Sequence, residues 1–301
     1  MARRSLRVLI LGGTGMLGHR LWMECRDEFE TFVTFRRLPI NCSDRPWAKL
    51  FDPARTRGGV DATNFESIRQ VIDETQPSIV INCIGIIKQL REANDPITSL
   101  QINALLPHEL KEFCHSRGIR LIHISTDCVF SGRRGNYRES DPSDAEDLYG
   151  RTKFFGEVTG EGILTLRTSI IGRELEARLG LVEWFLSQKG KTVKGYTRVI
   201  YSGITTPVLS QIIVQLLRDF PKLSGLYQVA GQMISKYALL KKIQEFFHLN
   251  VEISPYGDFQ CNRSLDGSQF VKETGIQIPG WDEMISGLYL ENKKYGGIYE
   301  S

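Results

Sequence analysis

The chain has 301 residues, of which 41% are hydrophobic and 24% are charged. These values are typical of soluble globular proteins and exclude a disordered chain, a collagen-like chain and a coiled-coil fibre. The 38 basic and 35 acidic residues leave a net charge of +3 and form no block of like charge, so the composition predicts neither a nucleic-acid partner nor a membrane partner.

The cysteines and histidines indicate no metal site. None of the six cysteines pairs with another at CxxC spacing, and the five histidines form no HExxH pattern. The N-terminal segment lacks a signal-peptide cleavage site, and no apolar run approaches the ~20 residues of a membrane span. We therefore expect a cytoplasmic protein with reduced thiols.

Buried strands and amphipathic helices alternate along the N-terminal half of the chain. The run 6–11 (LRVLIL) is apolar apart from Arg7, as expected for a strand buried on both faces of a parallel sheet. The segment 64–74 places Ile68, Val71 and Ile72 on one helix face. Further strands are predicted at 31–35, 78–84, 120–125, 163–168 and 226–229, and further helices at 16–26, 105–117, 181–188, 208–219 and 235–248.

This alternation predicts an α/β fold built on a doubly wound parallel sheet. We expect a first domain over residues 1–165 and a smaller C-terminal lobe over 166–301 that is partly interleaved with it. The segment 36–59 contains three prolines and paired glycines, and is predicted to be a long connection.

A glycine-rich loop, GGTGMLG at 12–18, follows the first predicted strand and opens the first predicted helix. Gly12 permits a tight turn, Gly15 lets the backbone approach a pyrophosphate, and Gly18 packs the helix close to the sheet. The phosphates would meet the unpaired N–H groups of the helix N-terminus. The loop therefore favours an NAD(P)-binding Rossmann fold over a turn with a structural role alone.

The second predicted strand ends in two arginines, Arg36 and Arg37, where NAD-binding proteins carry an acidic residue for the ribose 2′-hydroxyl. Guanidinium groups suit a 2′-phosphate, so the pair favours NADPH, with NADH as the alternative. A solvated pair of surface arginines is the other interpretation.

Tyr149 and Lys153 have the YxxxK spacing, which places both side chains on one face of a helix. A free tyrosine has a pKa of about 10, so a neighbouring ammonium is needed to make it a useful acid or base near neutral pH. Ser125, Thr126 and Asp127 end the fourth predicted strand, at the edge of the sheet where ligands bind. The three groups together predict a catalytic site.

With these motifs, the chain resembles the extended short-chain dehydrogenases/reductases, and within them the dTDP-4-dehydrorhamnose reductase family. The resemblance covers nearly the whole chain. It is carried by GGTGMLG (12–18), NCIG (82–85), LQINA (100–104), HISTDCVFSG (123–132), YGRTKFFGE (149–157) and LRTSIIG (166–172).

The resemblance implies NADPH-dependent reduction of a nucleotide-linked 4-keto-6-deoxy hexose, with Thr126, Tyr149 and Lys153 as the catalytic residues. It leaves a homodimer open. The cofactor would be held by Gly12, Thr14, Gly15, Met16, Leu17, Gly18, Arg36, Arg37, Asp61, Cys83, Ile84, Gly85, Asn103, Ser125, Tyr149, Lys153, Thr168 and Ile170. The substrate pocket is assigned Lys88, Thr126, Asp127, Cys128, Arg173 and Trp184, and no metal ligand is expected.

Cys128 departs from the family pattern and keeps other reactions open. Nucleotide-sugar 4,6-dehydratases resemble this chain but usually carry glutamate at this position, so Cys128 counts against a dehydratase. Rhamnose reductases usually carry tyrosine there. The GDP-fucose synthases carry a cysteine there for epimerisation, with a histidine partner, but the only histidine after Lys153 is His248. An epimerase or epimerase–reductase is therefore one alternative. A regulatory subunit like the beta subunit of methionine adenosyltransferase is the second. His19 is expected to be a surface or packing residue.

Overall fold

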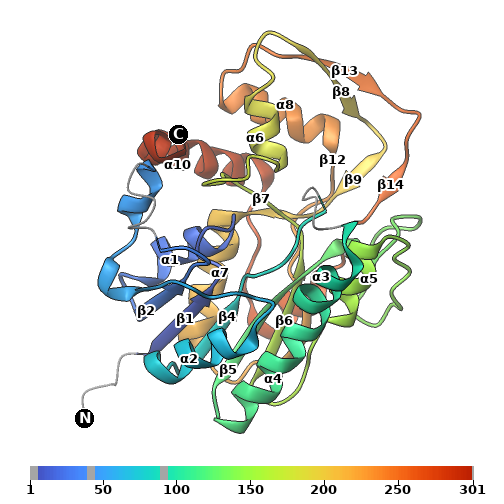
Figure 1. Cartoon of the computed structure of the whole chain (residues 1–301). Coiled ribbons are helices and arrows are strands. Elements are labelled where there is room, and N and C mark those ends of the chain that lie inside the picture. The colour runs from blue at the N-terminus through green and yellow to red at the C-terminus, as the bar shows by residue number, and fades with distance from the viewer. Residues whose placement is uncertain (1–5, 39–44, 89–93, 300–301) are drawn as a thin grey trace.

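A seven-stranded parallel sheet forms the centre of the molecule (Figure 1). The computed structural model describes residues 6–38, 45–88 and 94–299. The strand order is β11-β6-β5-β4-β1-β2-β3, with every neighbouring pair parallel. The strands are β1 (Arg7–Leu11), β2 (Glu30–Thr34), β3 (Thr56–Arg57), β4 (Ile79–Asn82), β5 (Arg120–Thr126), β6 (Ile163–Thr168) and β11 (Gly225–Gln228).

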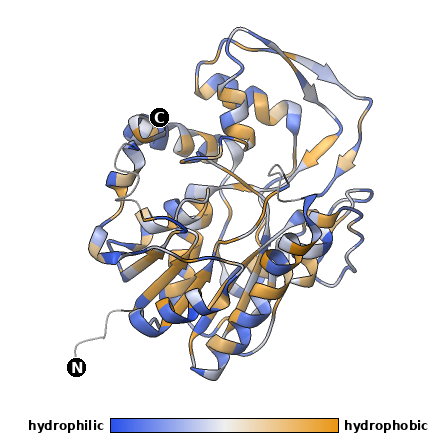
Figure 2. Ribbon diagram, in the orientation of Figure 1, coloured by the Kyte–Doolittle hydropathy of each residue, from blue (hydrophilic) through white to orange (hydrophobic). Residues whose placement is uncertain are grey.

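The central strands are apolar on both faces because helices cover both sides of the sheet (Figure 2). On one face lie α1 (Gly18–Cys25), α7 (Thr206–Asp219) and α10 (Trp281–Tyr299), which contribute to the larger core cluster. On the other face, α2 (Phe65–Thr75) and α4 (Leu106–Ser116) contribute to the second cluster. The expected doubly wound α/β sheet is confirmed.

The C-terminal half of the chain contributes both to this sheet and to a smaller lobe. Strand β11 pairs with β6, so the sheet is completed by a segment that follows the lobe's first elements. The domain boundary at residue 165 stays a prediction. The pairing of β11 with β6 shows that the C-terminal half also contributes to the main sheet. The lobe contains α6 (Leu181–Leu186), β8 (Thr192–Tyr196), β9 (Val199–Tyr201), β12 (Ile234–Ser235), α8 (Lys236–Phe246), β13 (Glu252–Tyr256) and β14 (Cys261–Asn262).

Short elements β7 (Ile170–Ile171) and β10 (Ile204–Thr205) pair with each other between the sheet and the lobe. Helix α9 (Ser268–Thr274) follows β14 and contacts β11. None of the helices described is long and apolar enough to cross a lipid bilayer.

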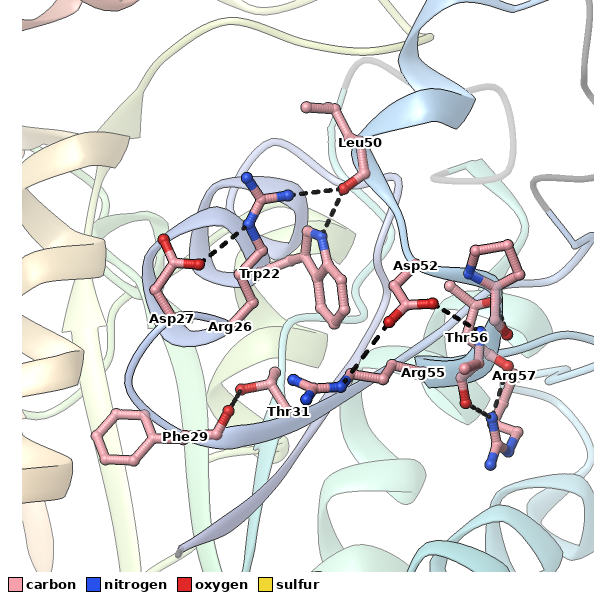
Figure 3. A network of polar contacts seen from close by, with 12 residues as sticks. Trp22, Arg26, Asp27, Phe29, Thr31, Leu50, Asp52, Arg55, Thr56 and Arg57 are labelled. Carbon is pink, nitrogen blue, oxygen red and sulfur yellow. Dashed lines mark hydrogen bonds and ion pairs between the residues drawn. The ribbon is translucent and has the colours of Figure 1, made fainter.

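The connection predicted over 36–59 has more structure than expected (Figure 3). Its described part contains two 3₁₀ helices, η2 (Pro46–Leu50) and η3 (Pro53–Arg55), and the edge strand β3. The segment is tied to α1 by the Leu50 carbonyl, which accepts hydrogen bonds from Trp22 Nε1 and from Arg26, each at 2.9 Å. A two-residue strand carries no readable period, which is why the sequence showed only a connection.

Candidate active site

The glycine-rich loop joins β1 to α1 and depends on glycine for its conformation. Gly12 has φ of 92°, in the left-handed region that favours glycine. A Cβ at Gly18 would lie 2.0 Å from the Gly12 carbonyl oxygen, so only glycine permits this close crossing. At Gly15, by contrast, a Cβ would meet only that same oxygen, at 3.3 Å, and the residue is exposed.

Helix α1 presents an uncapped N-terminus at the end of this loop. Its N-cap residue, Leu17, makes no side-chain capping hydrogen bond. The first N–H groups of a helix have no intrahelical partner and carry partial positive charge, so they suit phosphate oxygens. The loop and helix start therefore fit the diphosphate of a dinucleotide.

Arg36 and Arg37 lie immediately beyond β2, and both are exposed. Asp61 is also exposed, on the loop before α2, where its carboxylate accepts hydrogen bonds from the N–H and hydroxyl of Thr63. Those bonds, with a smaller contribution from the charge of Arg36, lower the pKa of Asp61. Arg36 and Asp61 are thus electrostatically coupled at this edge of the sheet.

The remaining cofactor candidates follow the carboxyl ends of neighbouring strands. Cys83, Ile84 and Gly85 come directly after β4. Asn103 lies in a π-helix, η5 (Leu100–Leu105), between α3 (Pro96–Ser99) and α4; its side chain is buried and exchanges two hydrogen bonds with the backbone of Ile86, at 2.9 and 3.2 Å. A π-helix is often found at functional sites. Thr168 ends β6, where its hydroxyl donates to the Val229 carbonyl, and Ile170 begins β7.

Tyr149 and Lys153 lie on α5 (Leu148–Phe155), which packs against the end of β5. A Cβ at Gly150 would lie 2.2 Å from the Cys128 carbonyl oxygen, so glycine lets the helix approach this turn closely. Asp147 caps the helix by accepting a hydrogen bond from Gly150 N at 2.8 Å. Gly150 therefore allows its neighbour Tyr149 to lie next to the residues that follow β5.

Lys153 is 5% exposed, and its ammonium donates to the Ile124 carbonyl at 2.8 Å. Burial lowers the pKa of Lys153 to about 8, against the opposing charges of Glu157 and Cys83. Burial also raises the pKa of Tyr149, and its hydrogen bond with Thr126 opposes that rise. The phenol therefore stays protonated at neutral pH, and the Lys153 ammonium is close to its own titration.

Thr126 ends β5 and is the N-cap of a 3₁₀ turn, η6 (Asp127–Val129). Its hydroxyl accepts a hydrogen bond from Cys128 N at 3.1 Å and donates to Asp127 Oδ1 at 3.2 Å. Burial raises the pKa of the Cys128 thiol to about 12, so the thiol is protonated at neutral pH. This disfavours Cys128 as a thiolate base.

Behind these residues lies a buried ion pair that the sequence interpretation did not find. Glu157 follows α5 and receives two hydrogen bonds from the Arg167 guanidinium of β6, at 2.9 and 2.6 Å. Ser125 Oγ donates to the same carboxylate at 2.6 Å. Both charged side chains are at most 6% exposed. The only sequence signal was the position of Glu157 at the end of YGRTKFFGE.

Of the other expected substrate contacts, Arg173 is placed least favourably. Its guanidinium is buried, pairs with Glu183 at 2.6 Å and lies over the Tyr299 ring. The assignment of Arg173 to the substrate pocket stays a prediction, which this tertiary contact disfavours because Glu183 already neutralises the charge. Lys88 is half-exposed and pairs with Asp147 at 2.6 Å, and Trp184 is 38% exposed on α6. Within the described ranges, no group of three or more His, Cys, Asp or Glu side chains is arranged to hold a metal ion.

Residues 6–291 match the family described as RmlD substrate binding domain. The chain belongs to this family. The glycine loop, the YxxxK helix and the Thr126 turn all fall within the matched residues, so the family's range contains every element of the candidate site.

Characterised relatives match part of the chain. A dTDP-4-dehydrorhamnose reductase of Streptomyces griseus is 31% identical over 152 residues, which are 50% of this chain and 43% of that protein. The methionine adenosyltransferase 2 subunit beta of Bos taurus is 28% identical over 174 residues, which are 56% of this chain and 48% of that protein. The chain thus spans about half the length of the curated relatives it matches.

Solved structures match the whole fold. The dTDP-4-dehydrorhamnose reductase of Bacillus anthracis, in complex with NADP, superposes with a TM-score of 0.78 and 22% identity. The match covers 97% of this chain and 100% of that one. It confirms the Rossmann fold with its C-terminal lobe.

Proposed function

We propose that this protein is an NAD(P)H-dependent oxidoreductase that reduces the 4-keto group of a nucleotide-linked 4-keto-6-deoxy hexose. The proposal is supported by two contacts at the carboxyl edge of a Rossmann sheet that also carries the glycine-rich loop: Tyr149 hydrogen-bonds Thr126, and Lys153 donates to the Ile124 carbonyl two residues earlier on β5. The reductases among its relatives support the same reaction class.

In this proposal Tyr149 is the general acid. When bound, a reduced nicotinamide supplies the hydride that the carbonyl carbon receives. Tyr149 donates its proton to the alkoxide oxygen that develops. Thr126 turns its one hydroxyl proton from Asp127 to the same oxygen and hydrogen-bonds it as its charge grows. Lys153, as an ammonium, stabilises the tyrosinate that remains and holds the nicotinamide ribose hydroxyls.

We further propose that NADPH is preferred over NADH. Arg36 and Arg37 are exposed at the end of β2, where a 2′-phosphate would lie, and two guanidinium groups there would bind it with charge-assisted hydrogen bonds. Asp61 would lie nearby on the cofactor's adenosine side. Lys88, Asp127, Cys128 and Trp184 are proposed to line the sugar pocket, with Cys128 as a protonated thiol.

The reaction should be lost at alkaline pH as Lys153 loses its proton. Because burial lowers the pKa of Lys153 to about 8, the free enzyme holds the ammonium below that pH and progressively loses it above. We expect kcat/KM, which reports the free enzyme, to fall tenfold per pH unit well above pH 8. In Lys153→Arg the guanidinium stays charged, so kcat/KM should not fall above pH 8, even if its value is lower than that of the wild type. A wild-type profile that is flat to pH 10 would contradict the role of Lys153.

The function is tested by NADPH oxidation with dTDP-linked and UDP-linked 4-keto-6-deoxy hexoses offered in parallel, and with NADH in place of NADPH. We expect stoichiometric oxidation with one of the sugars and a lower KM for NADPH than for NADH. Sugar conversion without net oxidation would indicate an epimerase. Binding of NADPH with no reaction on any sugar would favour the regulatory role that the beta-subunit relative represents.

A further inference from the structure

The last turn of α10 reaches the glycine-rich loop through a chain of buried polar contacts. The Tyr299 hydroxyl lies 3.2 Å from His19 Nε2 and 2.8 Å from Glu291 Oε1. His19 Nδ1 lies 2.8 Å from the Gly15 carbonyl oxygen. His19 is fully buried and Tyr299 is 2% exposed. His19 is therefore a packing residue, as one of the two expectations had it, but with polar contacts at both ring nitrogens.

The chemistry of these groups gives the imidazole a defined tautomer. A carbonyl oxygen can only accept, so His19 Nδ1 carries the proton that bonds Gly15. Burial lowers the pKa of His19 to about 4, and the nearby charges of Arg20 and Arg173 lower it as well. The ring is thus neutral at physiological pH, and Nε2 is an acceptor. The single proton of the Tyr299 hydroxyl is therefore shared between two acceptors, Glu291 Oε1 at 2.8 Å and His19 Nε2 at the longer distance of 3.2 Å.

Glu291 anchors the far end of this chain. Its second carboxylate oxygen accepts a hydrogen bond from Arg20 Nε at 2.8 Å, and Arg20 also pairs with Glu24 on α1. The side chain of Glu291 is 5% exposed. The Tyr299 hydroxyl is therefore held between a fixed carboxylate on its own helix and the imidazole of α1.

Tyr299 also contacts the segment 173–180, which reaches Met16 of the glycine-rich loop. The Arg173 guanidinium lies 4.6 Å from the centroid of its ring, and Arg178 donates to its carbonyl oxygen at 3.0 Å. A Cβ at Gly180, which ends this segment, would lie 2.7 Å from the Cε of Met16 in the loop. Tyr299 therefore contacts both His19, which bonds the glycine-rich loop, and the segment 173–180.

The contact with Gly15 matters because of peptide geometry. The Gly15 carbonyl and the Met16 N–H belong to one planar trans peptide and point in opposite directions. The carbonyl is held inward by His19, through Nδ1 at 2.8 Å and the backbone N–H at 3.3 Å. The Met16 N–H is thereby directed away from His19, and it donates to none of the residues that the structure describes.

We propose that His19 and Tyr299 are positioning residues that orient the Gly15–Met16 peptide to donate its N–H to the diphosphate of the dinucleotide. The inference rests on the proposed use of this loop for a dinucleotide. Neither residue touches the reacting atoms. Their removal should therefore weaken cofactor affinity and leave turnover at saturating cofactor unchanged.

The test compares NADPH affinity and turnover in three variants. Tyr299→Phe keeps the ring beneath Arg173 and loses only the hydroxyl, and His19→Leu loses both imidazole nitrogens. His19→Asn places an amide N–H where Nδ1 stood and so retains a donor to Gly15. We expect the Kd for NADPH, measured by fluorescence titration, to rise about three- to tenfold in Tyr299→Phe and at least as much in His19→Leu. His19→Asn should recover part of the loss.

Tyr289→Phe is the matched control, since it makes the same change on the same helix at a tyrosine whose recorded contacts are ring contacts. Its Kd should equal that of the wild type, and kcat should stay within twofold in every variant. Unchanged Kd in Tyr299→Phe and His19→Leu, with or without a lower Tm, would overturn the proposal. A wild-type protein that binds no NADPH would instead refute the dinucleotide site itself, so the two failures are distinguishable.

Discussion

Replacing Tyr149 with phenylalanine is expected to lower kcat by about 100- to 10,000-fold, the usual contribution of a positioned general acid. Phenylalanine fills the same space on α5 but carries no proton for the developing alkoxide. The burial that raises the pKa of Tyr149 keeps the wild-type phenol protonated, so the loss should be similar across the neutral range. The measurement is the rate of NADPH oxidation at saturating sugar and cofactor.

The Kd for NADPH should change little in this variant, because the phenyl ring and Lys153 remain in place. Tyr196→Phe, on strand β8 of the lobe, is the control: Tyr196 makes ring contacts with Tyr256 and Phe259, so loss of its hydroxyl should leave kcat unchanged. Full turnover by Tyr149→Phe would remove the proposed general acid and with it the assigned chemistry.

The strands of the main sheet, apart from the two-residue edge strand β3, could be predicted because they are largely buried. A strand such as β1 or β4 is then an uninterrupted apolar run, and the sequence contains the whole signal. Helix α10 was not predicted, although Trp281, Met284, Ile285 and Leu288 repeat at helical spacing and are buried in the structure. This spacing is sufficient to predict the helix from the sequence.

The candidate site divides in the same way. Short sequence motifs contain Gly12, Thr126, Tyr149 and Lys153. Each motif follows or packs against a predicted strand, which places these residues at the carboxyl edge of a parallel sheet. The ion pair between Arg173 and Glu183 could not be predicted from the sequence, because it depends on how α6 packs against the segment that contains Arg173. The His19–Tyr299 contact joins residues 280 positions apart, and no local pattern records such a pair.

The ion pair behind Lys153 predicts the largest loss of stability. Replacing Glu157 with glutamine leaves the Arg167 guanidinium in the interior without its carboxylate, and breaking a buried pair in this way typically costs about 3–5 kcal/mol. Ser125 Oγ would lose a charged acceptor as well. We expect the free energy of unfolding in urea to fall by that amount. The alkaline limb of kcat/KM should also move to lower pH, because the charge of Glu157 raises the pKa of Lys153.

Two further variants separate the loss of the pair from the loss of a glutamate. The double variant Glu157→Gln/Arg167→Met removes both charges, and most of the stability should return, since no unpaired charge then remains in the interior. Its alkaline limb should stay shifted, because the carboxylate is still missing beside Lys153. Glu161→Gln changes an exposed glutamate just beyond α5 and should alter stability by no more than about 0.5 kcal/mol. If Glu157→Gln were as stable as Glu161→Gln, the guanidinium would have found water or another acceptor, and the pair could not be what fixes the end of α5 against β6.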